Sequence, residues 1–247
     1  MLNRQNPPLE TADARFSMTR WSVVIAAQGD GDSARHALNE LCAQYWLPIY
    51  SFIRRKGHSP ADAEDLTQGF FADFLSRKSF NTVAEENGRL RTFLLRAVIR
   101  HMGHEREKST AAKRGGGVPV LSLDVQRAEG MYIAEPGHYV TPDLEFERQW
   151  ALTLLDRALD TVRAAATESN RTALFEELEG LISLAAPVAP YEEIACRLGL
   201  SESAVKSAAH RLRQEFRSAV RSLVAETVAN ESEIDDEIRH LFTLFAL

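Results

Sequence analysis

The chain has 247 residues and a mass of 27.6 kDa, and its 29 Lys and Arg against 35 Asp and Glu give a formal charge of −6. Its 45% hydrophobic and 26% charged residues are typical of a folded, soluble protein and exclude a disordered chain. No apolar run approaches the roughly 20 residues of a membrane span, and residues 1–15 lack the apolar core of a secretion signal. We therefore expect a cytoplasmic protein with no membrane partner and one large or two small domains.

The apolar spacing of the first half of the chain is helical. Helices are predicted over residues 16–28, 33–55, from Pro60 onward, and 88–108. Ser59 and Pro60 have the residue types of a helix N-cap and first helical position. The inner face of the helix from Pro60 is expected to carry Ala63, Leu66, Thr67, Phe70 and Phe74.

The second half resumes this pattern after a segment rich in Gly and Pro, which predicts a linker. Helices are expected over 144–166 and 172–184 and in two segments that end near residue 228. The fold class is therefore predicted as all-α, with two small helical domains and a flexible linker between them. The predicted boundaries are a flexible lead at 1–15, a first domain at 16–112, the linker at 113–142, a second domain at 143–228 and a C-terminal extension at 229–247.

Charge is distributed very unevenly along the chain. Residues 89–114 carry eight basic residues against two acids, and residues 197–221 carry six against two. Residues 226–239 carry six acids and one Arg. A basic helix face is most often a solvated surface, but one such face in each predicted domain favours nucleic-acid binding.

The segment 191–213 has the pattern of a helix-turn-helix. A short helix ends at Gly199, a C-cap residue type, and Ser201 is placed to cap a second helix with a polar and basic outer face. Ala195 is small enough for the helices to cross closely. The shared core is expected to contain Ile194, Leu198, Leu200, Val205 and Leu212. In such a motif the N-terminal half of the second helix enters the major groove; a helical hairpin used only for packing is the alternative.

Three motifs in order resemble bacterial sigma factors of the sigma-70 family, extracytoplasmic-function type. They are the acidic helix Asp62-Ala63-Glu64-Asp65-Leu66-Thr67-Gln68, the basic helix with Thr92-Phe93-Leu94-Leu95, and the segment 191–213. The segments 19–24, 113–117 and 235–241 look like one branch of these factors with an extended linker and C-terminus. The resemblance implies a region-2-like first domain, a region-4-like second domain, and promoter recognition as a subunit of RNA polymerase.

The resemblance also implies a role for each motif. The acidic helix would bind the β′ clamp helices of core RNA polymerase through Asp62, Glu64, Asp65 and Gln68. The helix over 88–108 would bind the −10 promoter element through Arg89, Arg91, Arg96, Arg100, His101, His104 and Arg106. The second helix of the helix-turn-helix would read the −35 element through Ser201, Ser203, Lys206, Ser207, His210, Arg211 and Arg213, next to a helix that contacts the β flap.

Two other classes of function compete with this interpretation. A helix-turn-helix regulator that is not a sigma subunit would bind DNA without core polymerase. An enzyme would need a metal site. His101, His104 and Glu105 could contact a metal, but they lie in one short segment and the sequence identifies no separate ligand elsewhere. We therefore expect no catalytic residue, no metal and no cofactor. Cys42 and Cys196 are expected to be small core residues.

Regulation leaves several alternatives open. An anti-sigma factor or a regulatory kinase is a candidate partner. Thr67 is a candidate phosphorylation site, although its inward spacing favours packing. Phe93 is a candidate platform for a flipped base, although its position at the edge of the apolar stripe favours the core. The C-terminal extension is a candidate autoinhibitory segment, with core packing of Leu241, Phe242 and Phe245 as the alternative.

Overall fold

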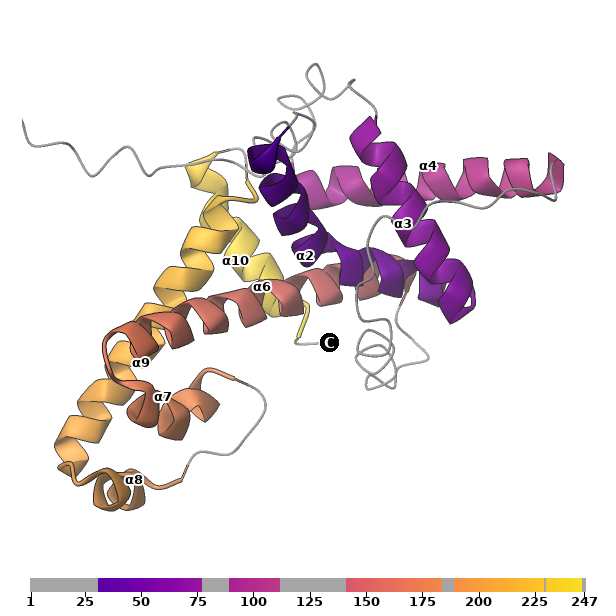
Figure 1. Ribbon diagram of the computed structural model, residues 1–247. Coiled ribbons are helices and arrows are strands. Elements are labelled where there is room, and N and C mark those ends of the chain that lie inside the picture. Colours follow the sequence, from indigo (N-terminus) through magenta and orange to yellow (C-terminus); the bar gives the residue numbers. More distant parts are fainter. Residues whose placement is uncertain (1–30, 77–88, 112–140, 184–188, 229, 246–247) are drawn as a thin grey trace, which may run out of the picture.

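The structure is a computed structural model that describes residues 31–76, 89–111, 141–183, 189–228 and 230–245. Every regular element of these residues is helical, which confirms the predicted all-α class (Figure 1). The α-helices are α2 (Asp32–Arg55), α3 (Pro60–Ser76), α4 (Leu90–Ala111), α6 (Pro142–Glu168), α7 (Thr172–Leu178), α8 (Tyr191–Leu198), α9 (Glu202–Ala225) and α10 (Ile234–Thr243). The predicted lead, the helix over 16–28 and linker residues 113–140 lie outside the described residues.

Most helices begin and end close to where the apolar spacing predicts them. The helix expected over 172–184 is shorter, because α7 ends at Leu178 and a 3-10 turn, η3 (Glu179–Leu181), follows it. Helix α10 and the 3-10 turn before it, η4 (Glu231–Glu233), were not predicted as helical.

Buried side chains of the described residues form two clusters that share two long helices. The larger cluster, here the main core, takes side chains from α2, α3, α4, α10, the first half of α6 and the second half of α9. The smaller cluster lies among α7, α8 and the other halves of α6 and α9. Helices α6 and α9 therefore connect the helix-turn-helix end of the molecule to the main core (Figure 1).

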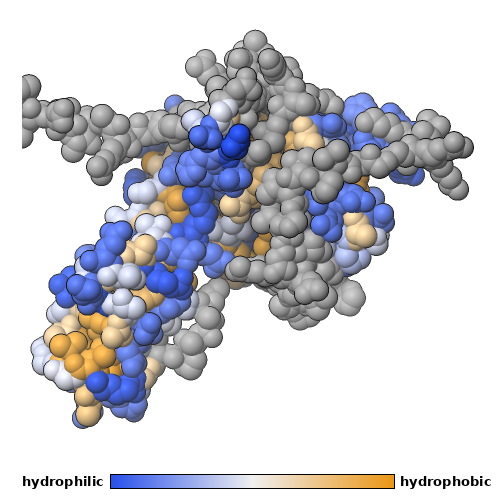
Figure 2. All heavy atoms as spheres, in the orientation of Figure 1, coloured by the Kyte–Doolittle hydropathy of each residue, from blue (hydrophilic) through white to orange (hydrophobic). Residues whose placement is uncertain are grey.

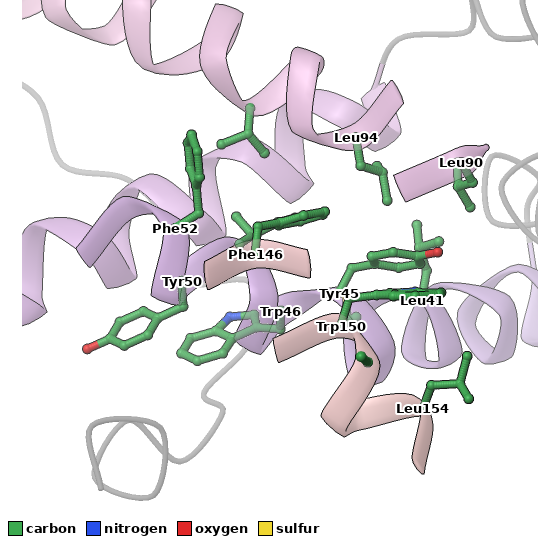
Figure 3. Close-up of a cluster of buried hydrophobic side chains, with 14 of the residues drawn as sticks. Leu41, Tyr45, Trp46, Tyr50, Phe52, Leu90, Leu94, Phe146, Trp150 and Leu154 are labelled. Atoms are coloured by element: carbon green, nitrogen blue, oxygen red, sulfur yellow. The ribbon is translucent and has the colours of Figure 1, made fainter. Parts of the chain in front are cut away.

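Helix α6 inserts two large aromatic side chains against α2 (Figure 3). Phe146 and Trp150 are fully buried, as are Leu41 and Tyr45 of α2. Within α2, the rings of Trp46 and Tyr50 stack with centroids 4.9 Å apart. Aromatic side chains dominate core energetics because each removes a large apolar area from water, so this contact is a main source of stability.

The main core crosses the expected domain boundary. It includes residues on both sides of the predicted linker, from Leu41 in α2 to Leu244 after α10. The predicted first domain is therefore completed by α6, α9 and α10, which lie in the segments predicted as the second domain and the extension.

The two cysteines differ in exposure, and the expectation that both are core residues is wrong for Cys196. Cys42 lies in the main core and Cys196 is exposed on α8. Burial raises the pKa of the Cys42 thiol to about 12, so this side chain stays protonated and unreactive near pH 8.

We expect a disulfide reagent at pH 8 to modify one thiol of the native protein rapidly and the second only after unfolding. Fast modification of both would contradict the burial of Cys42, and Cys196→Ser should remove the rapid phase.

Among the described residues, no helix combines the length and apolarity needed to span a membrane.

Candidate nucleic-acid interface

Helices α8 and α9 form the predicted helix-turn-helix. Gly199 ends α8 in the left-handed conformation, with φ +63°, which glycine adopts without a Cβ clash. Ser201 caps α9, and its Oγ accepts a hydrogen bond from the amide of Ala204 at 3.2 Å. Ala195 and Val205 are buried between the helices. Gly199 therefore ends α8 and Ser201 begins α9, as their residue types predicted.

The expectation that Leu200 belongs to the helix-turn-helix core is wrong. Leu200 is 42% exposed, whereas Ile194, Val205 and Leu212 are buried and Leu198 is half-buried. Leu200 lies in the turn, where its backbone amide donates a hydrogen bond to the carbonyl of Ala195 at 2.9 Å. Its side chain is exposed. Leu200 therefore contributes a backbone hydrogen bond to the turn and no buried side chain to the core.

The outer face of α9 presents the side chains expected at the −35 element. Ser201, Ser203, Lys206, Ser207, His210 and Arg211 are exposed, and Arg213 is half-buried. The Lys206 ammonium lies 2.6 Å from the Glu202 carboxylate one turn earlier. Such an exposed pair contributes little to stability, so Lys206 can exchange it for a phosphate.

Replacement of Gly199 tests the turn. An L-residue in the left-handed region costs roughly 1–2 kcal/mol, so we expect Gly199→Ala to lower the free energy of unfolding by about that amount in urea titrations. Gly103→Ala is the matched control, because Gly103 lies inside α4, has no positive φ and has open space around its Cβ position. The control should be stabilising by about 0.5–1 kcal/mol. Equal effects of the two changes would contradict the turn geometry.

The acidic residues of α3 lie together on one side of that helix. Asp62 and Asp65 are exposed, while Glu64 and Gln68 are half-buried and joined by a hydrogen bond from Gln68 Nε2 to Glu64 Oε1 at 3.1 Å. Ser59 caps the helix by accepting from the Asp62 amide at 3.2 Å, as its residue type predicted. This face, called here the acidic face, is accessible to a basic partner.

Thr67 and Phe93 both pack inward. Thr67 is fully buried, and its hydroxyl donates to the carbonyl of Ala63 at 2.6 Å, which fits packing and leaves no access to a modifying enzyme. Phe93 is half-buried against the main core, with its ring centroid 6.3 Å from that of Phe74. This placement favours the core alternative for both side chains.

Helix α4 divides the expected −10 residues into two groups. Arg96, Arg100, His104 and Arg106 are exposed on its outer surface, whereas His101 is buried. At the start of the helix, Arg89 forms an ion pair with α10 and Arg91 forms ion pairs with both α6 and α10. The outward group forms a basic surface on which a phosphate backbone could lie.

The ion pairs at the start of α4 join three helices into a cluster that sequence reasoning missed. Glu237 of α10 pairs with both Arg91 and, at 3.0 Å, Arg89. Arg91 Nε donates to Glu147 of α6 at 2.8 Å, and the same carboxylate lies 3.0 Å from Nε2 of His240. The partners are too distant in sequence for any local spacing to reveal the cluster.

The Arg91 guanidinium is also packed on an aromatic ring. It lies 4.5 Å from the centroid of the Trp150 ring and is 3% exposed. Burial lowers the pKa of Arg91, although the Glu147 carboxylate opposes this effect. Arginine remains charged in proteins, so the neighbouring carboxylates compensate a buried positive charge.

A cleft between α3 and α4 is lined by several ionisable side chains, among them Asp73, His101 and Glu105. His101 Nδ1 lies 3.1 Å from Asp73 Oδ2, and ligand atoms of Asp73, His101 and Glu105 lie within 4.8 Å of one another. His104, expected in a metal site by the enzyme alternative, is exposed and lies instead near Glu107. Asp73 was not among the residues that the sequence suggested for a metal site, because only the packing of α3 on α4 brings it to His101. The pair is equally explained as a buried histidine that is hydrogen-bonded to an aspartate.

In a comparison with known families, residues 189–216 match the family described as Sigma-70, region 4. This segment contains α8, the turn at Gly199 and the exposed polar and basic face at the start of α9. No curated protein and no solved structure gives a significant match. The chain therefore carries a segment similar to a DNA-binding region of the sigma-70 family, which supports a role in promoter recognition.

Proposed function

We propose that this protein is a sigma factor of the extracytoplasmic-function type that binds core RNA polymerase and directs transcription initiation. The observation that carries the proposal is the coincidence of the region 4 match with a capped helix-turn-helix whose basic face is exposed. A helix-turn-helix places its second helix in the major groove. Residues 201–213 would then read the −35 element, with Lys206 and Arg211 on phosphates or base edges.

The opposite end of the molecule supplies the other two surfaces that a sigma factor needs. Arg96, Arg100 and Arg106 on α4 would hold the −10 element, since guanidinium groups bind phosphates bidentately. The acidic face of α3 would bind the β′ clamp helices of the polymerase. Complementary charge would orient the encounter and raise its rate.

The remaining assignments follow from this role. Core RNA polymerase and promoter DNA are the partners, with contact to the β flap next to the helix-turn-helix, and the site of action is the cytoplasm. An anti-sigma factor or a regulatory kinase is a further candidate partner, although Thr67 is inaccessible as placed. The function involves no catalytic residue and no cofactor. Binding both promoter elements requires polymerase to hold the two basic faces on one DNA, so affinity for free DNA should be weak.

The test is association with core RNA polymerase, measured by co-purification and by fluorescence anisotropy of the chain labelled at exposed Cys196. The proposal predicts a stoichiometric complex that survives gel filtration. A chain that binds duplex DNA tightly by itself and does not associate with core polymerase would instead be a helix-turn-helix regulator.

A further inference from the structure

Helix α10 packs on the rest of the chain next to the start of α4. Its apolar side chains Ile234 and Leu241 are buried in the main core, together with Leu244 just after the helix. Arg221 of α9 pairs with Asp235, and Arg148 of α6 donates to the carbonyl of Leu244 at 3.1 Å. The C-terminal extension is therefore docked on the rest of the chain (Figure 1).

The contact between α10 and α4 is made by charge. Glu237 is fully buried, and its carboxylate pairs with Arg89 and Arg91. A buried carboxylate without partners is very unfavourable, because it loses its hydration. The docked position of α10 thus depends on these two guanidinium groups, which also belong to the residues expected to contact the −10 element.

A DNA phosphate would compete with the Glu237 carboxylate for these guanidinium groups. We propose that α10 is an autoinhibitory clasp that withholds Arg89 and Arg91 from promoter DNA in the free protein and leaves α4 when the polymerase complex forms. This inference rests on the proposed function for the identity of the DNA, but the clasp itself is a property of the free chain. A site that is competent in only a fraction of molecules binds with an affinity reduced by that fraction.

Two variants each remove one negative charge from α10. Comparing them distinguishes the loss of the Glu237 ion pairs from a general effect of charge on DNA binding. Glu237→Gln keeps the size of the side chain and removes the carboxylate that pairs with Arg89 and Arg91, while Glu147 still pairs with Arg91. Asp236→Asn is the matched control, because Asp236 is 60% exposed and pairs only within its own helix in the contacts described, with Arg239. Removing one partner of a buried pair typically shifts an equilibrium about a hundredfold or more.

The measurement is binding of the free, full-length chain to a mixed-sequence single-stranded DNA oligonucleotide at a series of salt concentrations. We expect Glu237→Gln to bind at least about tenfold more tightly than the wild type. Arg91 stays paired with Glu147, so one additional phosphate contact, at Arg89, should make the logarithmic salt slope steeper by about 0.7. Asp236→Asn should match the wild type in salt slope, and truncation after Asn230 should resemble Glu237→Gln.

Hydrogen exchange on the wild-type chain provides a second test that needs no variant. The clasp predicts that α10 amides exchange through a local opening, faster than the core amides of α2 and α6. Exchange of α10 only with global unfolding would overturn the proposal, as would a folded Glu237→Gln variant with wild-type DNA affinity and salt slope. Neither measurement contains polymerase, so failure of polymerase binding would count against the proposed function alone.

Discussion

Trp150→Ala is expected to lower the free energy of unfolding by about 3–5 kcal/mol, the usual cost of removing a large aromatic side chain from a core. Trp150 is fully buried where α6 meets α2, and its ring also packs against the guanidinium of Arg91. The variant therefore loses apolar burial and leaves a buried charge less well packed. Urea unfolding monitored by circular dichroism measures the change, with Ile99→Ala at a 46% exposed site of α4 as a control of small effect.

The same experiment tests how far the two ends of the molecule are coupled. Because α6 and α9 belong to both buried clusters, unfolding reported by circular dichroism and by a fluorophore on Cys196 of α8 should have one midpoint. Trp150→Ala should shift both signals together. A helix-turn-helix signal that keeps its wild-type midpoint in the variant would mean two independent domains joined by a linker.

Asp65→Lys is expected to weaken binding to core polymerase by about a hundredfold, because reversing one charge of an interfacial pair removes an attraction and adds a repulsion. Asp65 is exposed in the middle of the acidic face of α3. Its replacement should leave the fold intact, since exposed substitutions usually change stability by less than about 0.5 kcal/mol. Fluorescence anisotropy with the Cys196-labelled chain gives the affinity.

Asp160→Lys is the control for this charge reversal. Asp160 is 69% exposed on α6, and its ion pair with Arg163 lies within the same helix. The control should bind polymerase as the wild type does. Equal binding by Asp65→Lys would show that the acidic face is not the polymerase surface.

Local sequence signals were sufficient for the helices and for the helix-turn-helix. Serine is favoured at helix N-caps and glycine just after helix C-termini. The structure places Ser201 and Gly199 at these positions. Apolar spacing likewise predicted the buried side of α3, where Ala63, Thr67, Phe70 and Phe74 are buried and Leu66 is half-buried. These features depend on residues a few positions apart, which is why the sequence reveals them.

Contacts between distant segments could not be predicted in this way. The sequence showed an acidic extension and a basic helix, but not that Glu237 would reach Arg89 and Arg91. It also did not show that α6 would complete the core around α2, because an amphipathic helix reveals its apolar side and not its partner. The expected roles of Arg89 and Arg91 therefore stay predictions, since both are engaged with α10 in the arrangement described.

The most direct test of the promoter-recognition claim is in vitro transcription by core polymerase on a library of genomic fragments, with and without the protein. We expect discrete start sites that appear only with the protein and share sequence elements near −10 and −35. Lys206→Ala combined with Arg211→Ala should abolish most of these starts while leaving polymerase association intact. An unchanged pattern of starts on adding the protein, together with tight binding of the protein alone to duplex DNA, would contradict the claim.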